Sequence, residues 1–145
     1  MALFLPDAKV LIHALRKESA EHASCRQWLI SMAEKGDALG LCESVEIALR
    51  RIPTLPKLRL VPMSETLGFW KEDLWTYPGT RRLSAGDRHA EILANFIGEL
   101  GLCGNDLNDA WLAALAIENR ATLVSTDQGF DRFPGLKWIN PARGF

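Results

Sequence analysis

Short apolar runs alternate along this chain with longer segments in which apolar residues recur at helical spacing. Apolar runs typical of buried strands cover residues 3–5, 38–42, 121–125 and 136–139. Helical spacing predicts helices over residues 10–15, 20–35, 43–51, 64–74, 88–100 and 109–119. Because strands and helices alternate, the pattern predicts an α/β fold with a largely parallel sheet.

Candidate capping residues precede two of the predicted helices. Asp87 is a suitable N-cap for the helix over residues 88–100, because its carboxylate can accept a hydrogen bond from an N–H group of the first turn. Either Asn108 or Asp106 is placed to cap the helix over residues 109–119.

The size and composition of the chain fit one ordinary globular domain. It has 145 residues, of which 48% are hydrophobic and 24% charged, and we expect a single domain over residues 1–145. No apolar run approaches the roughly 20 residues that span a bilayer. The apolar N-terminus contains Asp7 and Lys9 and lacks a basic leader, so we expect no signal peptide and a cytoplasmic location.

The cysteines and histidines are too scattered to indicate a zinc site or a disulfide framework. Cys25, Cys42 and Cys103 form no Cys-x-x-Cys pair, and we expect them to be buried free thiols. The net charge of −1 does not by itself indicate a nucleic-acid binder, although an acidic metal site could offset a basic rim within that total.

Several acidic residues stand at the ends of predicted strands. Asp7 and Asp127 follow the first and third predicted strands, and Glu43 and Glu46 follow the second. Asp109 opens a helix that is otherwise almost entirely apolar. Ligands of open parallel sheets bind beyond the carboxyl ends of the strands, so we expect these acidic side chains to reach one crevice.

Carboxylates that converge in this way repel one another and raise one another's pKa values. A hard divalent cation removes that repulsion, and a set of oxygen ligands without cysteine or histidine suits Mg²⁺ or Mn²⁺. Such an ion polarises a phosphate and generates a nucleophilic hydroxide, which indicates phosphodiester hydrolysis.

Three stretches of the chain match a known family, in the family's order. They read LPDAKVLIHALR near the start, LRRIPTLP in the middle and NDLNDAWLAALAIENRATLVSTDQGFDRFPGLKW near the end. The chain resembles the PIN domain, specifically the VapC-type toxins of bacterial toxin–antitoxin pairs. The resemblance implies a three-layer α/β/α sandwich with a central, mainly parallel sheet. It also implies a Mg²⁺- or Mn²⁺-dependent endoribonuclease that cleaves single-stranded or loop RNA.

The resemblance assigns roles to residues of this chain. Asp7, Asp109 and Asp127 match the metal-binding aspartates of the family. Ser125 matches the small hydroxyl residue that stands two positions before the last of these acids.

Two positions depart from the family pattern. Lys9 stands where Asn or Ser is usual, and it could pair with a carboxylate or an RNA phosphate, weaken metal binding by charge competition, or point to solvent. Ala48 stands where the family's glutamate often lies. We favour Glu43 for that role and keep Glu46, one helical turn further on, as the alternative. Asp106 is interpreted as a loop or cap residue close to the motifs.

RNA binding needs basic side chains that contact phosphate. The best candidates are the adjacent pairs Arg50–Arg51 and Arg81–Arg82, because paired charges concentrate positive potential. Further basic candidates are Arg16, Lys17, Arg88 and Arg132. The resemblance suggests a tRNA or ribosomal RNA loop as the substrate.

The resemblance also implies two protein partners: a second copy in a homodimer, and a cognate antitoxin that blocks the metal cleft. Trp70 and Trp75 are candidates for an exposed apolar patch that would mark a partner site, with core packing as the alternative. Trp28, Trp111 and Trp138 fall on apolar faces, and we expect them in the core.

Two other functions compete with the nuclease. A catalytically weak PIN-fold module that binds RNA or regulates a partner is motivated by Lys9 and by the displaced glutamate, and titration with Mn²⁺ would separate the two. A phosphatase with Asp7 as covalent nucleophile is disfavoured, because position 9 is not aspartate and the chain has no glycine-rich phosphate loop.

Overall fold

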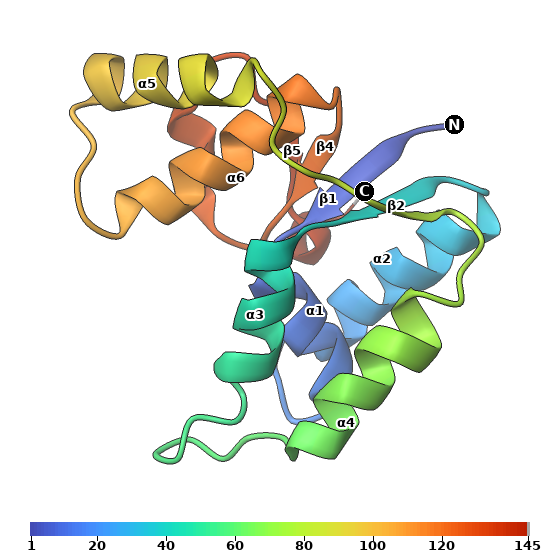
Figure 1. Cartoon of the computed structure of the whole chain (residues 1–145). Coiled ribbons are helices and arrows are strands. Elements are labelled where there is room, and N and C mark those ends of the chain that lie inside the picture. Colours follow the sequence, from blue (N-terminus) through green and yellow to red (C-terminus); the bar gives the residue numbers. More distant parts are fainter. Residues whose placement is uncertain (145) are drawn as a thin grey trace.

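The computed structural model describes residues 1–144, in which a five-stranded sheet lies between two groups of helices (Figure 1). In chain order the elements are β1 (Leu3–Pro6), α1 (Ala8–Leu15), α2 (His22–Glu34), β2 (Ala38–Leu41), α3 (Glu43–Arg51), α4 (Met63–Gly68), the π-helix η1 (Phe69–Leu74), β3 (Thr80–Arg82), α5 (His89–Leu100), α6 (Asp106–Glu118), β4 (Thr122–Val124), the 3₁₀ helix η2 (Gln128–Arg132), β5 (Trp138–Ile139) and the 3₁₀ helix η3 (Pro141–Arg143). None of these helices is long and apolar enough to cross a membrane.

The sheet is parallel throughout, with β1 at its centre. The strand order is β3-β2-β1-β4-β5, and Leu5 of β1 stands opposite Leu123 of β4. Helices α5 and α6 lie on one side of the sheet, whereas α1, α2, α3 and α4 gather on the other (Figure 1). The predicted three-layer α/β/α sandwich is therefore confirmed.

The core is continuous through the sheet and both helical layers. Leu5 and Leu123 are fully buried, as are Val10 of α1, Leu49 of α3 and Leu115 of α6. The consecutive residues 112–116 of α6 are all buried, which confirms that this apolar helix lies inside the molecule.

One strand has no counterpart in the prediction. Strand β3 has the polar sequence Thr80-Arg81-Arg82 and pairs only with β2, so it forms an edge of the sheet. Both arginines are exposed. An edge strand with exposed side chains needs no apolar alternation, and for that reason the hydrophobic pattern gave no sign of it.

Two helix boundaries differ from the prediction. Helix α6 begins at Asp106, with Asn105 as its N-cap, so the expected start at residue 109 and the capping roles of Asp106 and Asn108 were wrong. The segment predicted as one helix over residues 64–74 is α4 followed directly by the π-helix η1.

The N-terminus of α5 is capped from a distant part of the chain. Asp87 does not cap it, contrary to prediction, and the N-cap Arg88 makes no capping bond with its side chain. Instead, the carboxylate of Glu118 accepts hydrogen bonds from the backbone N–H groups of Gly86 (2.7 Å), Arg88 (3.0 Å) and His89 (3.0 Å). The last residue of α6 therefore satisfies the first donors of its neighbour α5.

Two expectations about burial need correction. Trp70 is only 3% exposed and packs in the core, so it cannot form part of an exposed patch, and Trp75 is partly buried against the same core. Trp28, Trp111 and Trp138 pack in or against the core as predicted. Cys103 is an exposed free thiol rather than a buried one, because it lies in the loop before α6, whereas Cys25 and Cys42 are buried.

Candidate metal centre

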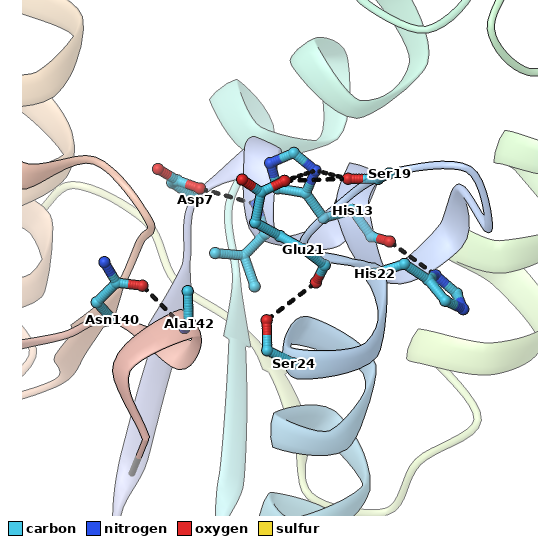
Figure 2. Close-up of polar contacts among 9 residues, drawn as sticks. Asp7, His13, Ser19, Glu21, His22, Ser24, Asn140 and Ala142 are labelled. Carbon is cyan, nitrogen blue, oxygen red and sulfur yellow. Dashed lines mark hydrogen bonds and ion pairs between the residues drawn. The ribbon is translucent and has the colours of Figure 1, made fainter.

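Asp7 is held rigidly where β1 ends and α1 begins. Its backbone N–H donates to the carbonyl oxygen of Val124 in β4 (2.9 Å), which continues the β1–β4 pairing by one residue. Its Oδ1 accepts a hydrogen bond from the N–H of Val10 (3.0 Å), so Asp7 is the N-cap of α1 (Figure 2). The side chain is almost fully buried.

Ser125 connects Asp7 to the segment that carries Asp127. Its hydroxyl donates to Oδ2 of Asp7 and accepts a hydrogen bond from the backbone N–H of Asp127 (3.0 Å). Asp127 in turn accepts from the N–H of Gly129 (2.8 Å) and caps η2. Each oxygen of Asp7 thus accepts one hydrogen bond and keeps acceptor capacity for another ligand.

A cavity of about 700 Å³ opens beside Asp7. Its acidic residues are Asp7, Glu43 at the first position of α3, and Asp109 in the first turn of α6, so three elements supply its negative charge. The remaining lining residues are Ala8, Lys9, Ser44, Val45, Ile47, Ala48, Arg51, Ile52, Asn108, Trp111, Leu112 and Phe130. The cavity therefore combines three acidic residues with a largely apolar wall.

Two of these carboxyl groups hold their protons more tightly than usual. Burial raises the pKa of Asp7 to about 6, although the hydrogen bonds from Ser125 and Val10 act in the opposite direction. Burial and the charge of Asp127 raise the pKa of Asp109, against the lowering effect of Arg132 and Lys9. The charge of Asp109 also contributes to the raised pKa of Asp7, so the acids influence one another across the cavity.

Arg132 lies against the acidic residues of α6. Its Nη2 is 3.5 Å from Oδ1 of Asp106 and 3.5 Å from Oδ2 of Asp109. Sequence reasoning placed Arg132 only among many possible phosphate contacts, because its proximity to α6 depends on how η2 packs.

The two candidate glutamates have separate environments. Glu43 is exposed and lines the cavity. Glu46 lies outside it and pairs with Arg50 (2.9 Å) and, at 4.0 Å, with Arg82. The arrangement therefore favours Glu43 as the acid that works with Asp7 and Asp109.

The candidate RNA-binding arginines also separate. Arg51 is exposed at the cavity, where Lys9 is the other basic residue. Arg50 lies over the Trp70 ring, 5.8 Å from its centroid, and Arg82 lies over Trp75 at 5.4 Å. Arg81 belongs to the edge strand β3 and does not line the cavity.

Comparison with known protein families shows which family the chain belongs to. The PIN domain profile matches residues 4–136. The chain belongs to the PIN-domain family. VapC ribonuclease Mb2897 of Mycobacterium bovis is 37% identical over 139 residues, which are 95% of each chain. Ribonuclease VapC37 of Mycobacterium tuberculosis is 34% identical over 136 residues, which are 93% of this chain and 94% of its relative. The resemblance noted in the sequence motifs is confirmed.

Solved structures show the same PIN fold at lower sequence identity. VapBC2 from Rickettsia felis, bound to a DNA fragment from its promoter, matches with a TM-score of 0.69 and 20% identity over 95% of this chain and 98% of the other. DNA-bound VapBC from Salmonella typhimurium gives a TM-score of 0.69 at 14% identity, over 97% and 99% of the two chains. At these identities the match concerns the fold alone.

The carboxylates of this PIN domain are ligands of the type that a divalent cation prefers, but they do not lie close enough together to share one ion. Within residues 1–144, no three His, Cys, Asp or Glu side chains are grouped tightly enough to hold one ion. The donor chemistry nevertheless fits, because Asp7, Glu43 and Asp109 offer oxygen ligands to one cavity and two of them carry raised pKa values that a cation would lower. A metal ion bound to Asp109 would have to compete with Arg132, whose Nη2 lies 3.5 Å from Oδ2 of that residue.

A second polar cluster lies at the other end of α1, outside the cavity (Figure 2). His13 Nδ1 is hydrogen-bonded to the hydroxyl of Ser19, which also donates to Glu21 (3.3 Å). Burial lowers the pKa of His13 despite the nearby Glu21. These contacts stabilise the turn between α1 and α2, and none of their side chains lines the acidic cavity.

Proposed function

We propose that this PIN domain is a Mg²⁺- or Mn²⁺-dependent endoribonuclease that hydrolyses RNA phosphodiester bonds as the toxin of a toxin–antitoxin pair. One observation carries the proposal: Asp7, Glu43 and Asp109 come from three different elements and line one cavity. The names of the relatives support the choice of RNA, since those that match over nine-tenths of the chain are called ribonucleases.

The different environments of these residues indicate different roles in the proposed reaction. Asp7 is the fixed ligand, because Val10 and Ser125 hold its carboxylate in one orientation. Asp109 and Glu43 complete the metal site from more exposed positions, and Asp127 adds negative charge beside Asp109. The bound ion would polarise the scissile phosphate and supply a hydroxide nucleophile.

Basic residues at the cavity would place the RNA backbone. Arg51 and Lys9 are exposed there and can contact the phosphates on either side of the scissile bond. Lys9 can serve as a phosphate contact and, because its charge also acts on Asp7 and Asp109, as a competitor of the metal. RNA loops suit the site, because unstacked bases can lie against the apolar wall that Trp111 and Ile47 help to form. A tRNA or ribosomal RNA loop is accordingly the proposed substrate.

The proposed partners follow from the relatives and neighbours. The solved structures that share this fold include DNA-bound VapBC from Salmonella typhimurium and a toxin–antitoxin complex from Klebsiella pneumoniae, which supports an antitoxin partner for this chain. A homodimer and a cytoplasmic location belong to the same proposal.

Incubation with total RNA, followed by mapping of new RNA ends, tests the proposal. We expect Mn²⁺-dependent cleavage by the wild-type chain that EDTA abolishes and Asp109→Asn removes, while Asp127→Asn reduces it less. Glu46→Gln is the matched control, because Glu46 is an acid of the same region that lies outside the cavity. RNA binding without new ends, and without Mn²⁺ binding at millimolar concentration, would instead identify a PIN-fold RNA-binding or regulatory module.

A further inference from the structure

Arg132 lies beside two acidic residues of α6, close to the cavity. Its guanidinium contacts Asp106 and Asp109 of α6 from η2, at 3.5 Å in both cases. The same group lies over the Phe133 ring, 4.9 Å from the centroid, and Phe133 is buried. A cation–π contact to a fixed ring restrains the guanidinium beside the acids without closing a tight ion pair.

The turn that carries Asp127 brings a third acid close to the guanidinium. A Cβ atom at Gly129 would lie 3.1 Å from Asp127 Oδ1 and 3.4 Å from Arg132 Nη1, so both groups border the same small space. Arg132 therefore contacts two acids of α6 and has Asp127, the acid that follows β4, nearby. Its positive charge is permanent, so it neutralises part of this cluster at every pH at which the protein is folded.

The contacts are loose enough to be exchanged. Distances of 3.5 Å exceed those of a strong charge-assisted hydrogen bond, and the side chain of Arg132 is 36% exposed. An ion pair of this kind contributes little binding energy, so a divalent cation can compete for the same carboxylate.

We propose that Arg132 is a positioning residue that serves as a built-in counter-ion of the acidic cluster and competes with the divalent cation for Asp109. The metal part of this inference rests on the proposed function. Asp106 holds the guanidinium at a second point, so that Arg132 can remain in place after Asp109 has bound the metal.

Mn²⁺ affinity, measured by calorimetry without RNA, tests the competition. We expect Arg132→Gln to bind Mn²⁺ about threefold to tenfold more tightly than the wild-type chain, because one nearby positive charge is removed. Arg26→Gln is the matched control, since it removes the same charge from an exposed position on α2, and its Mn²⁺ affinity should not change. Unchanged or weaker binding by Arg132→Gln overturns the inference.

A double-mutant cycle with Asp106→Asn separates competition from direct metal binding by Asp106. Without the Asp106 carboxylate, Arg132 has only Asp109 of this pair to contact, so Mn²⁺ binding should weaken. In the Arg132→Gln background the same change should weaken binding less, because only the negative charge of Asp106 is lost. An equal loss in both backgrounds overturns the inference, because Asp106 would then act on the metal without Arg132.

Melting in EDTA tests the counter-ion role independently of metal. Arg132→Gln should melt about 1–3 °C below Arg26→Gln, because the acids lose their neutralising charge, and equal melting temperatures overturn this role. If the wild-type chain cleaves RNA and Arg132→Gln leaves the Mn²⁺ affinity unchanged, this inference is refuted and the proposed function stands. Absence of Mn²⁺ binding in both the wild type and Arg132→Gln refutes the proposed function as well.

Discussion

Asp7 and Glu118 each accept hydrogen bonds at a helix N-terminus, and their environments have opposite effects on their pKa values. Asp7 caps α1 from a position that is only 8% exposed, and its pKa is raised to about 6. Glu118 lies at the N-terminus of α5, where three backbone N–H groups lower its pKa. Both residues can satisfy helix donors, so the difference comes from solvation and from neighbouring charge.

The comparison separates a carboxylate that stabilises the fold from the one that is proposed to bind metal. Glu118 is partly exposed and its two oxygens accept three hydrogen bonds, so its charged form stabilises the fold. Asp7 is buried near Asp109, so its charged form destabilises the fold unless a cation is close. A fold alone would be better served by a neutral residue at position 7, which supports the proposal that Asp7 binds metal.

The largest expected effect is loss of catalysis in Asp7→Asn. The amide can still cap α1, but it cannot supply the negative ligand, so cleavage should fall by about a thousandfold or more. Single-turnover cleavage of a mapped RNA at saturating Mn²⁺ measures this effect, and circular dichroism checks that the fold is intact. Wild-type rates in a folded Asp7→Asn variant would contradict the assigned role.

The next effect distinguishes the two glutamates of α3. Glu43→Gln should reduce cleavage by about tenfold or more, because Glu43 faces the cavity, whereas Glu46→Gln should change it less than about twofold. Glu46→Gln should instead lower stability slightly, since it weakens the pairing with Arg50. The reverse ranking of cleavage rates would assign the metal ligand to Glu46.

A smaller effect concerns Glu118. Glu118→Gln should lower the free energy of unfolding by about 1–2 kcal/mol at pH 7, because the amide is neutral and has one acceptor oxygen instead of two, so at least one of the three N–H groups loses its partner. The lowered pKa means that this stabilisation is present above the ordinary pKa of glutamate and is lost as the pH falls through the lowered value. Urea unfolding at pH 7 and pH 3 should show the two proteins converging at the acidic pH, with cleavage of RNA unaffected at pH 7.

The smallest effect is the contribution of Asp7 to the pH dependence of stability. Between its ordinary pKa of 3.8 and the raised value of about 6, the folded chain binds more protons than the unfolded chain. The resulting stabilisation is full below pH 3.8 and is lost as the pH rises through 6. In EDTA, stability should therefore fall between pH 5 and pH 7 by about 1 kcal/mol more in the wild type than in Asp7→Asn. Parallel pH profiles would show that Asp7 titrates normally.

The hydrophobic pattern predicted most of the fold because buried residues recur at regular spacing in most of the strands and helices. The strands that became β1, β2, β4 and β5 were expected near their observed positions, since each has buried neighbours in the sheet. Strand β3 was missed because Thr80, Arg81 and Arg82 form a polar edge with a single partner.

The site was predictable as a set of residues but not as a set of contacts. Asp7, Glu43 and Asp109 could be named from strand ends, one helix start and the family motifs, and the structure brings them to one cavity. The contact between Arg132 and Asp109 joins residues 23 positions apart and depends on how η2 packs against α6. No local pattern records such a contact, and the same holds for the capping of α5 by Glu118.

The bond between Ser125 and Asp7 has a consequence during protein synthesis. It joins residues 118 positions apart, and the central strand β1 lacks one of its two neighbours until β4 has been made. A nascent chain on the ribosome therefore carries its first acidic residue long before the serine that fixes it has been translated. Assembly of the acidic cavity must therefore wait until the segment that contains β4 and Ser125 has left the exit tunnel.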